Sequence, residues 1–453
     1  MRTTGRRSIV LYILLVAFAA GLAWLVISLV MNGGKWAMQP YNAHLGTAAM
    51  GEITDRDGNV LAKSVDGQRV YSEDELVRRA LLHTIGDNEG FISTSVQATM
   101  RSQLSGYNLI TGANQTIFSS LGSNVKLSIS EKVSMDAYNT LGDRKGAIFV
   151  YNYETGDVLC KVSKPSYDPY NPPSTEDVEG NSAYDGIYLD RNLSASFAPG
   201  SIFKLVTQAA AMDAYSDWAT REYTCNGSAD IGGSEVTCLH GTAHGTQNAS
   251  QALGNSCNVY YAMLANDLGA DSLQKKAEAF GWNEELRFGN AECSVSGINL
   301  SAANSNQLGW AGVGQYTVMA NPYHMLTLMG AIANGGTYNE PHISSSWNPF
   351  EGLTGGSRSY MSSTQADALK TMMRSNVANY YGDYLFPEGM NVCAKSGTAE
   401  VDGKDPTCWF VGFSDNASTP YAFVVVVEEG LGGIESAGNA ASAVMNSVVS
   451  NIK

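Results

Sequence analysis

Ser201 and Lys204 are the pair of residues in this chain with the clearest potential for chemistry. They follow Pro199-Gly200 and begin a stretch, Ser201–Ala214, whose apolar residues repeat at helical spacing. Residues three apart share a helix face, so the lysine amine can reach the serine hydroxyl. A serine is a weak nucleophile until a base takes its proton, and a lysine can be that base only where burial or a second cation lowers its pKa from ~10.4. The pair therefore predicts a nucleophilic serine, provided that a second cation lies nearby.

Two further motifs supply the remaining groups. Lys395–Thr398 is the only K-[ST]-G of the chain, and its surroundings predict the inner strand of a hairpin that pairs with Cys408–Phe413. Its lysine is the second cation, and its glycine lets a substrate backbone approach closely. The third motif, S-C-N at residues 256–258, lies between the two lysine motifs in the sequence. Its serine can relay a proton, and its amide can hold a peptide carbonyl.

Order and context separate these motifs from chance matches. The S-x-x-K pattern also begins at Ser123, Ser272 and Ser450. The S-x-N pattern also occurs at Ser414–Asn416, after the K-[ST]-G motif, and at Ser346–Asn348, in a loop-like stretch. Each motif alone has a structural explanation as a helix cap, a turn or a strand lysine. The three motifs in order favour one common site.

In this order, S-x-x-K, S-x-N and K-[ST]-G resemble the motifs of penicillin-binding proteins and serine β-lactamases. Further segments resemble penicillin-binding proteins and extend the likeness over most of the chain: Gly51–Ala62, Tyr151–Pro173, Val313–Tyr316, Ala331–Gly336 and Val424–Gly433. The first is similar to an R-G-x-I-x-D-R-x-G segment of the monofunctional class B branch, with Met50 in place of the leading arginine. The resemblance implies an α+β fold in which an antiparallel sheet packs between helices.

The resemblance also implies a role for each motif residue. The implied catalytic residues are Ser201 as nucleophile, Lys204 as base, Ser256 as proton relay and Lys395 as the cation that keeps Lys204 neutral. The oxyanion would lie between the backbone N–H groups of Ser201 and Thr398. The implied substrate-binding residues are Asn258, Ser396, Gly397 and Thr398. No metal and no cofactor are expected.

The implied reaction is D,D-transpeptidation of peptidoglycan through an ester on the nucleophilic serine, which β-lactams would acylate as mimics of D-Ala-D-Ala. Residues 35–140 are too few for the ~200-residue glycosyltransferase domain of class A enzymes. The chain also has no E-x-x-L-N element of the kind that class A β-lactamases use for deacylation. The sequence therefore resembles that of a compact class B protein. The alternatives are a D,D-carboxypeptidase, which uses water as acceptor, and a non-catalytic scaffold or β-lactam sensor.

The N-terminal residues predict a membrane anchor. Ile9–Met31 is almost wholly apolar and long enough for a spanning helix of ~20 residues. No A-x-A cleavage site follows, so we expect the segment to be retained. Three arginines precede it and only Lys35 follows directly, which predicts a cytoplasmic N-terminus and a catalytic domain outside the cell membrane.

We expect four parts: a cytoplasmic tail at 1–7, a transmembrane anchor at 8–34, an N-terminal pedestal or dimerisation-like module at 35–140 and the transpeptidase domain at 141–453. Turn residues predict strand–turn–strand over Gly51–Ala62 and a hairpin around Glu154–Asp157. Further predicted elements are a helix at Ser95–Leu104, strands at Val125–Ile129 and Phe423–Val427, and a helix at Ala440–Ile452.

Composition excludes two other classes of protein. With 44% hydrophobic residues, the 453-residue chain can form a sizeable core and is not intrinsically disordered. Its net charge of −15 and its lack of any Lys/Arg-rich run argue against nucleic-acid binding. The expected partners are peptidoglycan stem peptides, β-lactams, the membrane and a polytopic glycan polymerase of the shape, elongation, division or sporulation type.

The seven cysteines are too few for a disulfide scaffold, and their odd number leaves at least one thiol unpaired. Cys225 and Cys238 bracket a glycine-rich turn, and His240 and His244 follow. A zinc site is an alternative there, but the cysteines are too far apart for a C-x₂₋₄-C pair. We therefore expect a disulfide between Cys225 and Cys238, which an extracellular compartment permits, and a free, buried Cys257. No bridge is expected between Cys393 and Cys408, because the hairpin register would set Cys408 opposite Thr398.

Overall fold

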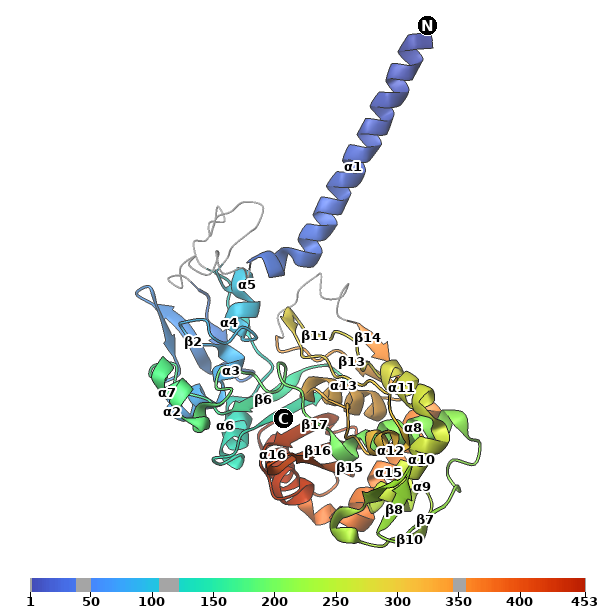
Figure 1. Ribbon diagram of the computed structural model, residues 1–453. Helices are drawn as coiled ribbons and strands as arrows, with labels where there is room; N and C mark the ends of the chain where they lie inside the picture. Colours follow the sequence, from blue (N-terminus) through green and yellow to red (C-terminus); the bar gives the residue numbers. More distant parts are fainter. Residues whose placement is uncertain (1, 38–49, 106–121, 345–355, 453) are drawn as a thin grey trace.

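Five antiparallel strands form the central sheet. The structure is a computed structural model that describes residues 2–37, 50–105, 122–344 and 356–452. Across the sheet the order is β15-β16-β17-β5-β6 (Figure 1). The bounds are β5 Gly146–Asn152, β6 Val158–Lys164, β15 Val392–Val401, β16 Lys404–Ser414 and β17 Tyr421–Val427. The predicted hairpin of β5 and β6 is confirmed, and Thr398 pairs with Cys408 as expected.

Helices cover both faces of this sheet, because alternate residues of its strands are buried on opposite sides. Ile148 and Val150 of β5 belong to the cluster that holds α6 (Glu131–Thr140) and α16 (Asn439–Asn451). Phe149 and Tyr151 face the other side, where α13 (Pro322–Ala333) packs on the sheet in the cluster that also holds α8 (Lys204–Ala214). The expected α+β fold, with an antiparallel sheet between helices, is confirmed.

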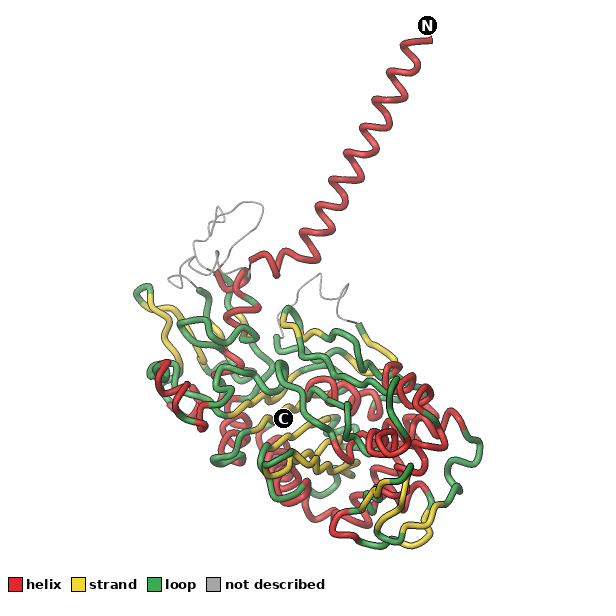
Figure 2. The backbone as a smooth tube through the Cα atoms, in the orientation of Figure 1, coloured by secondary structure: helices red, strands yellow, loops and turns green. Residues whose placement is uncertain are grey.

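A helical lobe lies beside the β15 edge of the sheet (Figures 1 and 2). Its helices are α9 (Ala249–Gly254), α10 (Asn258–Leu268), α11 (Ala270–Ala279), α12 (Ser305–Gly312) and α15 (Ser363–Asn376). The side chain of Asn376 donates to the carbonyl of Ala394 at 3.1 Å, and Arg374 donates to that of Val392 at 2.7 Å. These bonds fasten α15 to the start of β15, and α15 in turn packs against α9.

Short elements fill the connections between the larger ones. The short strands are β7 Tyr223–Cys225, β8 Ser228–Ile231, β9 Ser234–Thr237, β10 Gly245–Gln247, β11 Arg287–Phe288, β12 Ala291–Glu292, β13 Thr337–Asn339 and β14 Ser357–Ser359. The short helices are α7 Thr175–Gly180, and single turns at Ser182–Tyr184, Gly200–Phe203, Leu239–Gly241, Val377–Tyr381, Asp383–Leu385 and Gly433–Gly438.

A second sheet lies in the N-terminal part of the chain, in the order β3-β2-β1-β4. Its strands are β1 Ile53–Thr54, β2 Val60–Val65, β3 Gln68–Tyr71 and β4 Val125–Lys126, with helices α2 Glu75–Ala80, α3 Leu82–Ile85, α4 Val96–Thr99 and α5 Arg101–Ser105. The predicted strand–turn–strand is confirmed, and Asp55 closes its turn by accepting from the N–H groups of Asp57 and Asn59, both at 2.9 Å. Strand β4 is shorter than predicted, because after Lys126 the chain leaves the pairing with β1.

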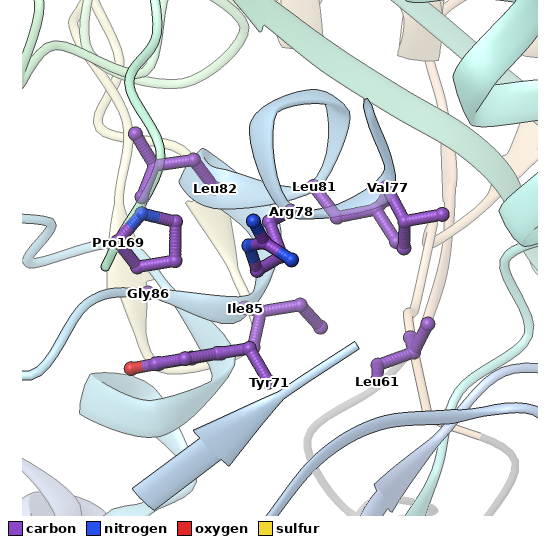
Figure 3. Close-up of a pocket in the computed structure, with 9 residues that line it drawn as sticks. All are labelled: Leu61, Tyr71, Val77, Arg78, Leu81, Leu82, Ile85, Gly86 and Pro169. Atoms are coloured by element: carbon purple, nitrogen blue, oxygen red, sulfur yellow. The ribbon is translucent and has the colours of Figure 1, made fainter. Parts of the chain in front are cut away.

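The proline-rich segment after β6 joins this N-terminal sheet to the central one. Arg78 of α2 donates to both carboxylate oxygens of Asp168, at 2.8 and 2.7 Å, and its guanidinium stacks over the ring of Tyr170. Pro169 lies beside Leu82 and Gly86 at a cavity of ≈ 10 Å³ (Figure 3), a volume for one water at most. The junction is therefore closely packed.

Helix α1, Arg2–Ala37, projects away from the rest of the molecule (Figures 1 and 2). Its segment Leu11–Ser28 has a mean hydropathy of 2.4, and none of it is buried. It is long and apolar enough to cross a membrane once. The helix is longer than the predicted anchor, since it begins at Arg2.

A buried ion pair links β6 to the loop after α7. Lys161 and Asp190 lie 2.5 Å apart, with side chains only 1% and 0% exposed. Lys161 also donates to the carbonyl of His83 in α3 at 3.3 Å, so one amine joins three segments. Removing one member of such a pair leaves an uncompensated buried charge, which typically costs ~3–5 kcal/mol.

We expect Lys161→Met to lower the melting temperature of the detergent-solubilised protein by roughly 5–10 °C, because Asp190 stays buried without its partner. The matched control is Lys132→Met, which removes a surface ion pair with Asp136 in which the lysine side chain is 60% exposed. Such pairs are worth only ~0.3–0.5 kcal/mol. Equal melting temperatures for the two variants would show that the buried pair contributes nothing.

Candidate active site

The turn that carries Ser201 begins at a glycine in the left-handed backbone conformation. Gly200 has φ +55°, and the single 3₁₀ turn Gly200–Phe203 precedes the first residue of α8, Lys204. The predicted helix over Ser201–Ala214 therefore starts as a 3₁₀ turn, in which residues three apart are eclipsed. That geometry brings the Lys204 Nζ atom to 3.0 Å from the Ser201 Oγ atom. The expected contact between the two side chains is present.

Two glycines let this turn lie directly against β15. A Cβ atom on Gly200 would lie 2.6 Å from the carbonyl oxygen of Thr398, and one on Gly397 would lie 2.7 Å from that of Pro199. Both distances are shorter than any real Cβ contact, so a side chain at either position would separate the turn from the strand. The missing side chain of Gly397 thus lets the Ser201 turn approach closely. The expected close approach of a substrate backbone stays a prediction.

Ser256 connects the two lysines. It follows α9 and adopts φ +52°, a left-handed conformation that is costly for a residue with a side chain. Its Oγ atom accepts from the Lys395 Nζ atom at 3.0 Å and lies 3.3 Å from the Lys204 Nζ atom. Its carbonyl oxygen accepts from Lys204 at 2.6 Å. A strained backbone therefore presents both oxygens of one serine to the site.

Asn258 is the first residue of α10, and both the oxygen and the nitrogen of its side-chain amide form hydrogen bonds. Its Oδ1 atom accepts from Lys204 at 2.8 Å, and its Nδ2 atom donates to the carbonyl of Thr237 at 2.8 Å. The amide is thereby oriented by Lys204 on one side and by the end of β9 on the other.

Lys395 lies in β15, opposite Val411 of β16, and is fully buried. Besides Ser256 it donates to the carbonyl of Ser396 at 2.8 Å and to the hydroxyl of Tyr381 at 3.4 Å. Tyr381 also accepts from the backbone N–H of Ser396 at 3.2 Å, and its hydroxyl lies 3.1 Å from the Ser396 Oγ atom. Sequence reasoning missed Tyr381, because it lies outside every motif. The π-helical turn Val377–Tyr381 carries it to the lysine.

Burial controls the charge of the two lysines. Both side chains are fully buried, and among the described residues neither forms an ion pair with a carboxylate. Burial and then the positive charge of Lys395 hold the pKa of Lys204 well below 10.5. Burial alone lowers the pKa of Lys395 to about 7. A neutral Lys204 can accept a proton from the Ser201 hydroxyl, as a general base must.

Ser396 and Thr398 are two residues apart in β15, so they share a face of the strand, and both are half-buried. The Thr398 Oγ1 atom accepts from the backbone N–H of Gly433 at 3.0 Å. Of the other S-x-N matches, Ser414 lies apart from this site, and its hydroxyl donates to the carbonyl of Met390 at 2.8 Å. Ser346–Asn348 falls outside the described residues.

The expected disulfide between Cys225 and Cys238 is absent from the structure. Their Sγ atoms lie 3.6 Å apart, well beyond the ~2.05 Å of a bond between sulfurs, and both thiols are free. The Cys238 Sγ atom also lies 3.7 Å from that of Cys257, so the two cysteines belong to a cluster of three thiols. Cys257 is fully buried, as expected, but it belongs to this thiol cluster.

Comparisons with known proteins agree with this geometry. The chain is 28% identical over 360 residues to the peptidoglycan D,D-transpeptidase PbpA of Mycobacterium tuberculosis, covering 71% of this chain and 70% of that protein. Its fold is similar to that of penicillin-binding protein A from M. tuberculosis, solved as a penicillin G acyl-enzyme complex (TM-score 0.75, 24% identity, 89% of this chain and 100% of that one).

The same fold occurs in PBP2 of Helicobacter pylori, solved in complex with MreC, with a TM-score of 0.73 at 17% identity over 89% of this chain and 97% of that one. The family profile of the penicillin binding protein transpeptidase domain matches residues 146–450. This match spans more than half of the chain and includes all three motifs around Ser201, so the chain belongs to the penicillin-binding protein transpeptidase family.

Proposed function

We propose that this protein is a peptidoglycan D,D-transpeptidase of the class B type, and that its Ser201 forms an ester both with stem peptides and with β-lactams. The observation that carries the proposal is the convergence of two buried lysine amines on the hydroxyls of Ser201 and Ser256. The relative named as a D,D-transpeptidase and the acyl-enzyme structure described above support the same reaction.

In the first half-reaction, Ser201 attacks the carbonyl of the penultimate D-Ala of a stem peptide, and neutral Lys204 takes the hydroxyl proton. The tetrahedral intermediate then breaks the peptide bond, and Ser256 passes a proton to the departing D-Ala amine. The Ser256 hydroxyl is suited to this relay because its Oγ atom lies within 3.3 Å of both lysine amines. In the second half-reaction an amine of a neighbouring stem attacks the ester and frees Ser201.

Substrate binding is assigned to the residues around this nucleophile. The oxyanion would be held by the backbone N–H groups of Ser201 and Thr398, and losing one such donor typically costs ~10²–10³ in rate. The terminal carboxylate would be bound by the hydroxyls of Ser396 and Thr398 with the charge of Lys395. Their half-buried position on one face of β15 supports this assignment. Asn258 would orient the acyl side chain.

The domain division that goes with this function is a tail at 1–7, an anchor at 8–34, a pedestal module at 35–140 and a transpeptidase domain at 141–453. The separate N-terminal sheet and the family match from residue 146 support it. We place the N-terminus in the cytoplasm and the catalytic domain outside the cell membrane, because three arginines precede the apolar segment of α1.

We also propose a polytopic glycan polymerase as partner, since cross-linking of stem peptides acts on the glycan strands that such a polymerase makes. The complex of H. pylori PBP2 with MreC supports a protein partner of the cell-shape type.

Ser201→Ala should abolish covalent labelling by a fluorescent penicillin, because the Ser201 Oγ atom, 3.0 Å from the Lys204 Nζ atom, is the atom that forms the ester in the proposed reaction. The measurement is fluorescence of the denatured protein after gel electrophoresis. The matched control is Ser272→Ala, which changes the exposed serine of another S-x-x-K sequence and should leave labelling unchanged. Persistent labelling of Ser201→Ala would defeat the assignment.

The acylation rate should follow a bell-shaped pH profile. It should rise with pH as Lys204 loses its proton, at a pKa well below 10.5, and fall as Lys395, with a pKa of about 7, loses the charge that attracts the penicillin carboxylate. The two amines titrate as a coupled pair. In Lys395→Met the charge that lowers the pKa of Lys204 is gone, so the acid limb should move to higher pH.

Second-order rate constants for penicillin labelling, measured between pH 5 and 9, would define the rising and the falling limb of the pH profile. Lys404→Met is the control, because this lysine of β16 is 61% exposed and its loss should leave the profile in place. An acid limb that moves to lower pH in Lys395→Met would contradict the proposed coupling.

Product analysis distinguishes the transpeptidase from a D,D-carboxypeptidase. With a synthetic stem pentapeptide and a D-amino acid as acceptor, we expect the exchanged peptide as the main product and free D-Ala in equal amount. Mass spectrometry of both products checks the stoichiometry. Release of D-Ala with only the hydrolysed tetrapeptide at every acceptor concentration would assign the carboxypeptidase reaction instead.

A further inference from the structure

Three cysteines and one histidine converge directly behind the active site. Cys225 ends β7, Cys238 follows β9, His244 precedes β10, and Cys257 caps the N-terminus of α10. Their ligand atoms, three sulfurs and one ring nitrogen, all lie within 4.8 Å of one another. The small strands and α10 that carry them lie together in the helical lobe (Figure 1).

The distances within this cluster match those around a tetrahedral zinc ion. With Zn–S of ~2.3 Å and Zn–N of ~2.0–2.1 Å, two sulfurs of such a site lie about 3.8 Å apart, and a sulfur and a nitrogen about 3.6 Å. Here Cys238 lies 3.6 Å from Cys225 and 3.7 Å from Cys257, sulfur to sulfur, and the Cys225 sulfur lies 3.5 Å from the His244 Nδ1 atom.

We propose that Cys225, Cys238, His244 and Cys257 bind one zinc ion in a closed structural site. A Cys₃His set with all four positions taken by protein is a structural type of zinc site and leaves no open position for catalysis. Binding releases the thiol protons to solvent, because the ligands are thiolates. The proposal goes beyond the transpeptidase function and rests on the coordinates of the four side chains.

A disulfide would explain the cluster less completely. A bond between Cys225 and Cys238 would use two of the four groups and leave the Cys257 thiol and the His244 imidazole against it. It would also need the sulfurs to close from 3.6 Å to ~2.05 Å. One metal ion uses all four groups at the distances that they already have.

Backbone N–H groups around the sulfurs are suited to thiolates. The N–H of Gly227 donates to the Cys225 sulfur at 3.4 Å, and that of Tyr260 donates to the Cys257 sulfur at 3.3 Å. Cys257 stands at the positive end of the eleven-residue helix α10, which also favours negative charge. Such outer hydrogen bonds orient metal ligands and moderate the charge on them.

Because Cys257 lies within the S-x-N motif, a metal bound to it would also affect the active site. Ser256 and Asn258 flank it, and Asn258 donates to the carbonyl of Thr237, the residue before Cys238. A zinc ion would thus tie β7, β9 and α10 together around the two S-x-N side chains, and would hold Ser256 in its strained conformation with φ +52°. Cys257 acts here as a positioning residue, through Ser256 and Asn258.

Metal analysis of the full-length, detergent-solubilised protein tests the proposal. The protein is purified through a tag without histidine, and zinc is measured by inductively coupled plasma mass spectrometry. We expect one zinc per chain, and seven reactive thiols after denaturation with chelator and without reductant. Cobalt(II) in place of zinc should give the visible bands of tetrahedral coordination and thiolate charge-transfer absorption.

Two pairs of variants locate the ion. Cys225→Ser and His244→Gln should each lose more zinc affinity than the ~10–100-fold that changes outside the ligand set cost, measured by competition with a chromophoric chelator. Their controls are Cys293→Ser, a buried cysteine outside the cluster, and His240→Ala, an exposed histidine four residues before the ligand. Both controls should keep one zinc per chain. His244 is only half-buried, so its variant should fold even where a cysteine variant does not.

Metal-free protein with five or with seven free thiols would overturn the proposal, and so would equal zinc loss in His240→Ala and His244→Gln. Penicillin labelling provides a separate measurement. Removal of zinc should slow acylation by up to ~10²-fold, the cost of a displacement of about 1 Å, while Ser201→Ala should keep its zinc. A wild-type protein that is purified without zinc and is labelled by penicillin would refute the zinc site and leave the transpeptidase function intact.

Discussion

Two lysine amines share one water-poor site in which the described residues provide no carboxylate, and the remaining features of the active site depend on this. Lys204 and Lys395 are both fully buried and both contact the Ser256 hydroxyl. Two ammonium groups in such a place repel each other, and each loses hydration, so the neutral form of one is favoured. Lys204, whose pKa burial and the charge of Lys395 hold well below 10.5, is the lysine that contacts Ser201. The fold therefore produces a base at neutral pH from a residue that is normally an acid.

This electrostatic arrangement requires that three distant segments meet within hydrogen-bonding distance. The central sheet supplies Lys395, and α8 supplies Lys204 directly after the turn at Gly200. The turn can touch β15 only because Gly200 and Gly397 have no side chains, since a Cβ atom on either would overlap a carbonyl of the other segment. Helix α15 and its π-helical extension then bring Tyr381 to the far side of Lys395. The packing of residues outside the active site thus sets the distances between the groups within the site.

Ser256 is the most strained of these positions and has the least regular support, because it stands between two helices with φ +52°. The cluster of three thiols and one imidazole lies immediately next to it in the chain. A metal there would supply the rigidity that α9 and α10 alone do not, and it would connect the stability of a small surface hairpin to the proton relay. The same cysteines would then serve the mechanism without touching substrate.

The local patterns of the sequence were sufficient for much of the fold and for the main site residues. The hairpin of β5 and β6, the register that pairs Thr398 with Cys408, and the buried strand β17 follow from alternation and turn residues, which act over a few positions. The helix after Ser201 was also predicted, although its first turn is 3₁₀. The three motifs pointed to Ser201, Ser256 and Lys395 because their order and their flanking residues distinguish them from the other matches in the chain.

Only the tertiary structure decided the contacts that depend on long-range packing. No periodicity indicates that Tyr381 approaches Lys395, that Gly397 makes room for Pro199, or that Cys257 joins Cys225 and Cys238 in one cluster. Each of these contacts joins segments whose separation in the sequence carries no local signal. The first two depend on packing against β15, and the third on packing within the helical lobe. The sequence by itself determined which side chains could do the chemistry, since that depends on residue type and neighbours. The folded chain determined which of these side chains are buried together in one site, since burial and convergence are properties of the whole core.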